Sequence, residues 1–303
     1  MVTRQDYNVD IRPTWCVGCG NFAILNMLKR VLPEVGLAPE DVILVTGIGQ
    51  AAKTPDYMRI NGFNGLHGRP LPVATGIKLA NHDLKVIVEH GDGDGYGEGG
   101  NHFLHSIRRN IGLIDVIHNN HVYALTKGQF SPTSRFGLKT STSPEGSRER
   151  PLNPLALALS QGATFVARSY SFSIEHMGKM LTAALAHRGY ALLEIMQVCV
   201  TFNRAMSNDF YREHVYDIQE EGHDTGDRDA AMAKAYEFPG GERIPIGIFY
   251  QDESVPAYEE MVPTLEAGPL VSQPLHRRPL KEHRSLIEEL LTEGTELEAG
   301  RGG

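Results

Sequence analysis

Four short runs of nearly continuous apolar sequence constrain the fold of this chain more than any other feature. They span residues 41–49, 83–95, 112–120 and 191–198. Between them, helical patterns are predicted over residues 21–32, 71–81, 101–110 and 173–187. Strands that are apolar on both faces belong to parallel sheets covered by helices on both sides. The sequence therefore predicts an α/β fold with a mostly parallel sheet and helices on both faces.

The pattern changes after residue 204, which suggests two parts. Residues 205–303 are more polar, contain several prolines and show a short amphipathic pattern only near their end, over 281–300. We expect a domain over 1–204 and an irregular C-terminal extension over 205–303 that packs on the domain or on a partner subunit. Within the domain, the Ser-, Thr-, Gly- and Pro-rich stretch 126–153 is too long for an idle connection and predicts a functional or mobile loop.

Charge and cysteine content narrow the partners. The chain has 303 residues, with 29 Lys and Arg against 37 Asp and Glu, a net charge of −8. This balance disfavours nucleic acid and anionic membranes as partners. No apolar run approaches the roughly 18 residues that a membrane span needs, and residues 1–15 lack an apolar signal core. We expect a cytoplasmic protein, in which three cysteines act as metal-ligand or redox residues rather than forming disulfides.

A glycine-rich turn around Asp92 gives the clearest chemical signal. The stretch GDGDGYGEGG (91–100) ends an apolar run, and HNNHVY (118–123) begins about 25 residues later. A right-handed crossover of this length places the ends of both strands side by side at the carboxyl edge of the sheet, where such sheets bind ligands. Glycine-rich backbone suits a phosphate, and Asp92 and Asn120 offer oxygen ligands to Mg²⁺. The spacing therefore predicts a site for a diphosphate and a metal ion.

The GDG turn followed by NN resembles the thiamine diphosphate motif. Together with CVGCG, TGIG, HGRPLPVATGIKLAN and YALTKGQFSPTS, in that order, residues 12–204 resemble the β subunit of the 2-oxoacid:ferredoxin oxidoreductases, most closely the 2-oxoglutarate branch. The later stretch RIPIGIFYQDESVPAYEEMVP is similar too. The resemblance implies a thiamine diphosphate-binding fold. It also implies an enzyme that converts 2-oxoglutarate, coenzyme A and oxidised ferredoxin to succinyl-CoA, carbon dioxide and reduced ferredoxin, or the reverse.

The resemblance also implies a partner. In this family the α subunit supplies the glutamate that acts on the cofactor, and it provides contacts to coenzyme A. The chain alone is therefore expected to be inactive. The expected assembly is an αβ heterodimer or a pair of heterodimers, with ferredoxin as electron carrier.

By the same resemblance, Mg²⁺ is held by Asp92, Asn120 and the backbone carbonyl of Val122. His67 would donate to a phosphate oxygen with Arg69 supporting it by charge, although from the residues alone His67 is better interpreted as a satisfied loop histidine. The turn 47–49 would lie at the aminopyrimidine. The expected cofactor-binding residues are Gly47, Ile48, Gly49, His67, Gly68, Arg69, Gly91, Asp92, Gly93, Asp94, Asn120, Val122, Tyr123, Leu125 and Thr126.

Two lysines bear on the choice of substrate. Lys53 matches a family position near the substrate carboxylates, and Lys127 fits a site for the distal carboxylate of a dicarboxylic 2-oxoacid. An ammonium facing a partly desolvated carboxylate makes a strong, charge-assisted hydrogen bond. Both are assigned as catalytic residues and favour 2-oxoglutarate; pyruvate or a branched 2-oxoacid is the alternative substrate. A non-catalytic redox scaffold is the alternative from another functional class.

The cysteines match the family pattern incompletely. Cys16, Cys19 and Cys199 fall on three of the four thiolate positions of a [4Fe–4S] cluster, and Gln50 falls on the other. A neutral amide oxygen is a poor ligand for iron–sulfur chemistry. Three outcomes stay open: a four-iron cluster with a non-cysteine ligand, a three-iron cluster, or no cluster.

Overall fold

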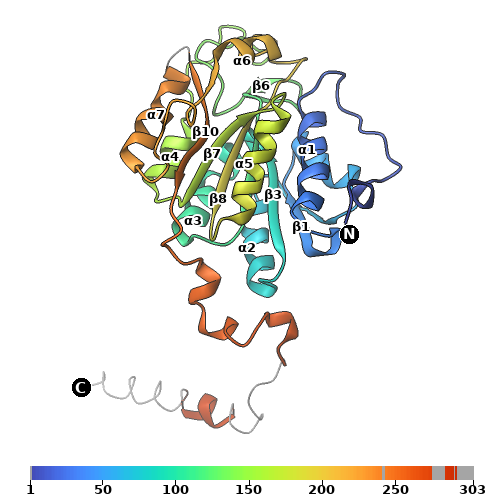
Figure 1. The fold of residues 1–303 in the computed structure, drawn as a ribbon, viewed down its shortest axis with the longest axis vertical. Helices are drawn as coiled ribbons and strands as arrows, with labels where there is room; N and C mark the ends of the chain where they lie inside the picture. Colours follow the sequence, from blue (N-terminus) through green and yellow to red (C-terminus); the bar gives the residue numbers. More distant parts are fainter. Residues whose placement is uncertain (1, 241–242, 275–283, 290, 292–303) are drawn as a thin grey trace, which may run out of the picture.

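The computed structural model describes residues 2–240, 243–274, 284–289 and 291 (Figure 1). Its main sheet has eight strands in the order β2-β1-β3-β4-β8-β7-β10-β9. The strands are β1 (Val42–Thr46), β2 (Asn61–Asn64), β3 (Lys85–Gly91), β4 (Ile114–Asn119), β7 (Phe165–Tyr170), β8 (Ala191–Met196), β9 (Val215–Asp217) and β10 (Ile244–Gln251). Neighbours pair in parallel except β10 and β7, which are antiparallel. A separate hairpin joins β5 (Val122–Tyr123) and β6 (Gln129–Phe130).

Helices cover both faces of the sheet. They are α1 (Asn21–Glu34), α2 (Pro70–Ala80), α3 (Gly100–Arg109), α4 (Pro154–Ser160), α5 (Ile174–Ala186), α6 (Asn208–His214) and α7 (Arg228–Gly240). Successive residues of β3 enter opposite cores, as strand geometry requires. Ile87 belongs to the core that α1 and α5 cover, whereas Val86 and Val88 belong to the core that α2, α3, α4 and α7 cover. Figure 1 shows α1 and α5 together on the near side of the sheet.

The predicted fold class is confirmed, since each of the four apolar runs contains a parallel strand and each helical pattern overlaps a helix. Four strands of the main sheet were not predicted, and two of them, β7 and β10, lie in its interior. β7 has the sequence FVARSY, whose Arg168 and Ser169 hide its burial, and β10 contains Pro245. Arg168 is nevertheless buried, because its Nε donates to the equally buried carboxylate of Glu194 at 2.7 Å.

The chain beyond residue 204 contributes to the same sheet. β10 pairs with β7 and buries Ile244 and Phe249, and β9 pairs with β10. After β10 the chain leaves the sheet through three short 3₁₀ turns and passes beside α2 (Figure 1). The predicted division at residue 204 stays a prediction. Of the amphipathic pattern over 281–300, residues 284–289 are helical, and most of the remainder lies outside the described residues.

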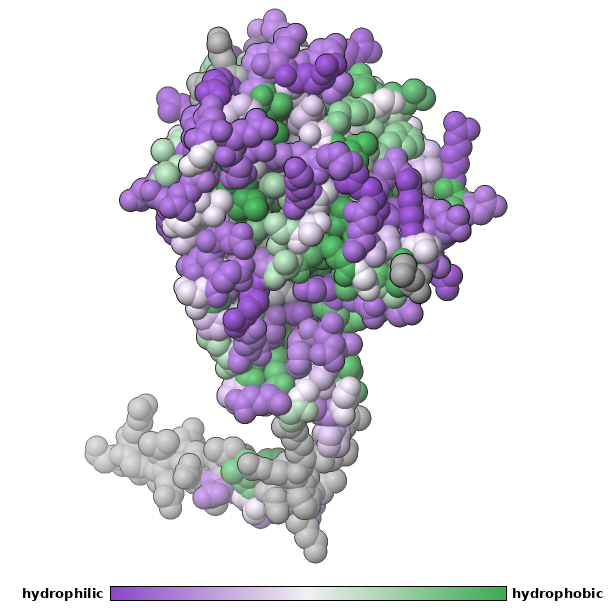
Figure 2. Space-filling model, viewed as in Figure 1, coloured by the Kyte–Doolittle hydropathy of each residue, from purple (hydrophilic) through white to green (hydrophobic). Residues whose placement is uncertain are grey.

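Figure 2 shows mainly hydrophilic side chains on the visible face, with smaller apolar patches between them. In the described part of the chain, no helix is long and apolar enough to cross a membrane.

The carboxyl ends of β3 and β4 lie next to each other, as the crossover argument requires. Gly91 at the end of β3 is in register with His118 near the end of β4. Asp92 and Asn120 closely follow these positions, so the fold itself brings together the two predicted metal ligands.

Candidate functional site

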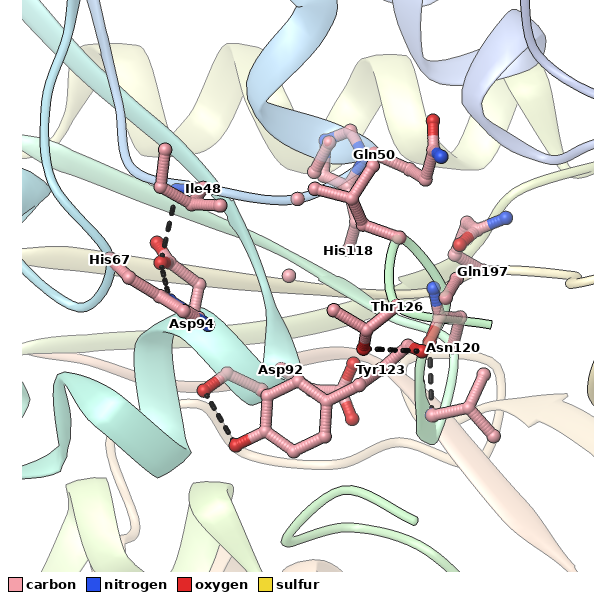
Figure 3. A pocket seen from close by; sticks show the side chains of 17 residues that line it. Ile48, Gln50, His67, Asp92, Asp94, His118, Asn120, Tyr123, Thr126 and Gln197 are labelled. Carbon is pink, nitrogen blue, oxygen red and sulfur yellow. Dashed lines mark hydrogen bonds and ion pairs between the residues drawn. The ribbon is translucent and has the colours of Figure 1, made fainter. Parts of the chain in front are cut away.

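A pocket of about 510 Å³ opens at the carboxyl ends of β3 and β4 (Figure 3). It is lined by Ile48, Gly49, Gln50, Ala51, His67, Gly91, Asp92, Gly93, Asp94, His118, Asn120, Val122, Tyr123, Ala124, Leu125, Thr126 and Gln197. Twelve of the fifteen residues predicted to bind a cofactor are in this lining; the exceptions are Gly47, Gly68 and Arg69. The size is in the ordinary range for a pocket that binds an organic cofactor, ~300–1,000 Å³.

Asp92 has the features of a cation ligand. It is buried, and its Oδ2 accepts hydrogen bonds from Ser131 Oγ at 2.5 Å and Thr133 Oγ1 at 2.7 Å. Its Oδ1 is buried without a hydrogen-bond partner among the described residues. Burial raises the pKa of Asp92 to about 6, and the two hydroxyl bonds only partly oppose that rise. A buried carboxylate with one free oxygen needs a compensating cation, so the site fits Mg²⁺.

The other two predicted ligands lie in one tight turn. Asn120 Oδ1 accepts the backbone N–H of Val122 at 3.0 Å, and Asn203 Nδ2 donates to the Asn120 carbonyl at 3.0 Å. His121 between them has a positive φ of 60°, a conformation that β-branched or bulky residues rarely adopt. Both Asn120 and Val122 line the pocket, so the turn holds them together at the end of β4.

The segment after Asp92 is a π-helix, Gly93–Glu98, where the sequence suggested a turn before the helix. A Cβ on Gly93 would lie 2.2 Å from the Tyr123 ring, so glycine is required for this close packing. Tyr123 in turn donates its hydroxyl to the Gly93 carbonyl at 3.3 Å. π-Helical turns often occur at functional sites, and here the turn closes one wall of the pocket.

Asp94 joins two loops of the pocket. Its Oδ1 accepts from the backbone N–H of Gly68 at 2.8 Å and of Ile48 at 3.1 Å, and from His67 Nδ1 at 2.5 Å. Burial alone would raise the pKa of Asp94, but the adjacent His90 ring and the two backbone donors hold it below its ordinary value. Figure 3 shows His67, Asp94 and Ile48 grouped at one end of the pocket. Asp94 therefore acts on the pocket by fixing both loops.

Two of the three predicted residues outside the lining pack against this carboxylate. A Cβ on Gly47 would lie 2.0 Å from Asp94 Oδ2, and Gly68 donates its N–H to the same side chain. The third residue, Arg69, contacts His102 Nε2 through Nη1 at 3.0 Å. These residues shape the loops around the pocket.

The predicted lysines lie outside the pocket lining. Lys53 is half-buried in the 3₁₀ segment Ala51–Tyr57, and Lys127 is exposed beside Thr126, which does line the pocket. Lys127 has a positive φ of 80°, the left-handed region. Strain of this kind in a non-glycine residue concentrates at functional sites.

A second pocket, of about 430 Å³, contains all three cysteines. It is lined by Thr14, Trp15, Cys16, Cys19, Asn21, Gln50, Asn120, Ala124, Gln197, Cys199, Val200, Thr201 and Phe202. Gln50 thus lines the same pocket as the three cysteines, and its place at a cluster corner stays a prediction. Two side-chain donors reach the sulfurs: Thr201 Oγ1 lies 3.2 Å from Cys16 Sγ, and Gln197 Nε2 lies 3.4 Å from Cys19 Sγ. The backbone N–H of Asn21 also donates to the Cys19 sulfur.

The cysteine pocket suits a cluster better than a single ion. Among the described residues, no three His, Cys, Asp or Glu side chains form a group that could hold one metal ion. In an iron–sulfur cluster each iron takes its own thiolate, so the ligands stand farther apart. Burial raises the pKa of Cys19 to about 11, and the neighbouring Cys199 and Cys16 add to the rise. A positively charged metal centre would offset this cost. The residues therefore fit three corners of a cluster.

The two pockets share a wall, and the second reaches the surface. Gln50, Asn120, Ala124 and Gln197 line both pockets. On its other side the cysteine pocket shares Cys199 and Val200 with a surface hollow that includes Phe172 and Arg204. Cys16 is exposed, and Val17 beside it is 95% exposed.

Several residues of the site were not predicted. Ser131 and Thr133 hold Asp92, and Gln197 separates the pockets. The hydroxyl-rich stretch SPTS (131–134) could have indicated Ser131 and Thr133 as hydrogen-bond donors. Gln197 had no such signal, since it lies within the apolar run 191–198 and fits the end of a strand.

Comparisons with known proteins agree with this arrangement. Residues 45–195 match the family model of the thiamine pyrophosphate enzyme, C-terminal TPP binding domain. Residues 199–267 match the family model for the C-terminal region of the pyruvate ferredoxin oxidoreductase beta chain. The chain is similar to the 2-oxoacid:ferredoxin oxidoreductase subunit beta of Saccharolobus solfataricus, with 42% identity over 86% of this chain and 89% of that one.

Two further similar proteins are named for 2-oxoglutarate. The 2-oxoglutarate oxidoreductase subunit KorB of Mycobacterium tuberculosis is 45% identical over 66% of this chain and 53% of that one. A solved structure, 2-oxoglutarate:ferredoxin oxidoreductase from Magnetococcus marinus with 2-oxoglutarate, coenzyme A and succinyl-CoA bound, superposes with a TM-score of 0.86. It is 37% identical, and the match covers 94% of this chain and 96% of that one.

Proposed function

Because the chain belongs to the β subunits of the 2-oxoacid:ferredoxin oxidoreductases, we propose that it serves an enzyme that interconverts 2-oxoglutarate and succinyl-CoA. The reaction consumes 2-oxoglutarate, coenzyme A and oxidised ferredoxin and yields succinyl-CoA, carbon dioxide and reduced ferredoxin, or runs in reverse. The observation that carries the proposal is the shared wall between a pocket suited to a magnesium diphosphate and a pocket lined by three cysteines.

In this proposal Asp92, Asn120 and the Val122 carbonyl hold Mg²⁺ on the diphosphate of thiamine diphosphate. When bound, that cofactor would supply a nucleophilic carbon and an electron sink for the loss of carbon dioxide from a 2-oxoacid. Ser131 and Thr133 keep the Asp92 carboxylate in place. Asp94 fixes the turn 47–49 and engages His67 Nδ1. In the ring protonated on both nitrogens, His67 Nε2 would then be the donor to a phosphate oxygen.

The preference for 2-oxoglutarate rests on two lysines and on the relatives named above. Lys127 is exposed next to Thr126, which lines the first pocket. Lys53 follows Gln50 and Ala51, which line the same pocket. Each is within a few residues of the pocket rather than in it. We propose that Lys53 lies near the substrate carboxylates and that Lys127 pairs with the distal one. Pyruvate or a branched 2-oxoacid is the alternative substrate.

Electrons would leave through the cysteine pocket. We propose that Cys16, Cys19 and Cys199 hold an iron–sulfur cluster, with Gln50 at the corner that has no thiolate. We propose that a ferredoxin approaches the cluster through the surface hollow that shares Cys199 with this pocket. Exposed thiolate chemistry of this kind fits a reducing cytoplasm.

The enzyme requires the α subunit, which would supply the catalytic glutamate and contacts to coenzyme A. We propose an αβ heterodimer or a pair of heterodimers.

Co-expression with an α subunit and anaerobic purification test the proposal. We expect 2-oxoglutarate- and coenzyme A-dependent reduction of a low-potential dye, together with iron, acid-labile sulfide and a paramagnetic resonance signal. If the complex binds thiamine diphosphate but no 2-oxoacid supports dye reduction, the protein is instead a redox scaffold. A complex that prefers pyruvate would refute the substrate assignment.

A further inference from the structure

Two amides stand between the proposed cofactor pocket and the cysteine pocket. Of the four residues that line both pockets, Asn120 is assigned to the metal and Ala124 has no polar side chain. Gln50 and Gln197 are left, and Figure 3 shows them near each other at one end of the cofactor pocket. Of these two, Gln197 is the one whose side chain reaches a cysteine sulfur.

The Gln197 side chain is held in a single orientation. The residue is 2% exposed, and its backbone N–H donates to the Asn119 carbonyl at 2.8 Å. Its Nε2 lies 2.5 Å from the Val198 carbonyl and 3.4 Å from Cys19 Sγ. Both partners are acceptors, and the amide nitrogen carries the only two donor hydrogens of the side chain. A flipped amide would place its oxygen against the Val198 carbonyl, so the nitrogen must face the sulfur.

An N–H donor at this place acts on the two redox states unequally. A cluster becomes more negative when it takes up an electron, and part of that charge resides on the cysteine sulfurs. A donor directed at such a sulfur therefore stabilises the reduced state more than the oxidised state. Hydrogen bonds to the sulfurs and solvent exposure are among the features that set cluster potentials. Little water competes with the Gln197 bond, because the residue is buried.

We propose that Gln197 is a positioning residue that raises the reduction potential of an iron–sulfur cluster bound by Cys16, Cys19 and Cys199. The inference rests on the proposed function and deepens it. Gln197 gains and loses neither proton nor electron in this role: it remains a neutral amide in both states. Thr201 makes a comparable bond to Cys16, but Cys16 is exposed, so water can replace that bond.

Redox titration of the assembled complex, followed by electron paramagnetic resonance, tests the proposal. The variants are Gln197→Leu and Gln197→Met, which replace the amide donor with an apolar side chain of similar volume. The matched control is Gln161→Leu, the same exchange at an exposed position outside both pocket linings. Iron and sulfide content is measured for each protein. We expect both Gln197 variants to keep the cluster and to titrate at a more negative potential, and the control to titrate with the parent.

The outcomes separate the inference from the proposed function. An unchanged potential in a fully loaded Gln197 variant overturns the inference and leaves the proposed function intact. Loss of the cluster from both variants also overturns it, because Gln197 would then build the site rather than tune it. A parent complex without iron and sulfide would refute the cluster assignment itself, and the inference with it.

Discussion

At the scale of single residues, the site is defined by polar atoms that the protein leaves incompletely satisfied. Asp92 Oδ1 is buried without a partner among the described residues, although Oδ2 of the same side chain accepts two hydroxyl donors. Since buried polar groups are nearly always paired, an unpaired carboxylate oxygen at a pocket wall indicates a ligand. Asp94 Oδ2 also lacks a hydrogen-bond partner among the described residues, but it lies 3.5 Å from His90 Nδ1, and Asp94 Oδ1 accepts three donors. Its charge therefore already has a neighbouring histidine to balance it, which the Asp92 carboxylate does not.

Replacement of Asp92 by Asn should separate stability from cofactor binding. Its pKa is raised from 3.8 to about 6 in the folded protein, so the ionised carboxylate destabilises the metal-free fold. This loss of stability grows as pH rises from 3.8 through about 6 and then levels off. A shift of this size corresponds to roughly 3 kcal/mol. We expect metal-free Asp92→Asn to melt higher than the parent at neutral pH, with no gain below pH 3.8.

The same variant should lose Mg²⁺-dependent binding of thiamine diphosphate, because an amide offers the ion no negative charge. Calorimetry on the assembled complex measures this binding. Near-normal affinity would contradict the assignment of Asp92 as a metal ligand. A lower melting temperature of the variant at neutral pH would contradict the argument that the ionised Asp92 carboxylate destabilises the metal-free fold.

Lys127 provides the test of substrate choice. Lys127→Ala keeps a Cβ at the positive φ of 80°, so backbone strain changes little while the ammonium is removed. We expect kcat/KM for 2-oxoglutarate to fall by the factor that corresponds to about 2–3 kcal/mol of lost transition-state stabilisation. The kcat/KM for pyruvate should change far less. Steady-state kinetics with both substrates measures the difference. Equal losses on the two substrates would rule out a role at the distal carboxylate.

At the scale of elements, the pocket depends on a loop that reaches back to the end of a strand. The stretch 131–134, directly after β6, carries the hydroxyls that bind Asp92 and the Ser134 hydroxyl that donates to the His121 carbonyl. The long loop 126–153 thus anchors both strand ends at the site. Its function follows from these contacts rather than from its length.

Removal of one anchor should weaken cofactor binding without unfolding the protein. Ser131→Ala deletes the 2.5 Å bond to Asp92 and leaves the Thr133 bond. A hydrogen bond to a charged group contributes ~1.5–3 kcal/mol, so we expect about a tenfold or greater loss of thiamine diphosphate affinity. The matched control is Ser141→Ala, an exposed position of the same loop. Equal affinities of the two variants, measured by calorimetry with Mg²⁺, would argue against an anchoring role.

At the scale of the whole molecule, one sheet unites both parts of the chain. β10 closes the sheet beside β7, and Phe249 and Ile244 are fully buried there. Arg168, itself buried on β7, lies over the Phe249 and Phe238 rings at 5.5 Å from each centroid. Residues on both sides of position 204 therefore share a core.

Truncation tests whether the predicted division at residue 204 marks an independent domain. A fragment of residues 1–204 loses β9, β10, α6 and α7 and would expose the apolar edge of β7 and the charge of Arg168. We expect this fragment to be insoluble or to unfold without cooperativity, whereas a chain of residues 1–274 should melt cooperatively. Circular dichroism on heating distinguishes them. Cooperative unfolding of soluble 1–204 would support the division.

The sequence by itself determined four neighbouring parallel strands, the helices between them and the approach of Asp92 to Asn120. Continuous apolar runs revealed the four central parallel strands, because a strand buried on both faces cannot alternate with polar residues. The GDG-to-NN spacing located Asp92 and Asn120, because one crossover fixes the distance between neighbouring strand ends. β7 and β10 were not predicted, because Arg168 and Pro245 are untypical of buried strands. Their burial depends on partners elsewhere in the chain.

The tertiary structure alone decided which distant residues meet. It brought Ser131 and Thr133 to Asp92, fixed two loops on Asp94, and set Gln197 between two pockets with its amide on Cys19. None of these contacts has a local pattern, because hydrogen bonds across 39 or 178 positions of sequence depend on how the strands and loops pack. Local periodicity reports burial, whereas the partners of a buried polar group are fixed only when the whole sheet has assembled.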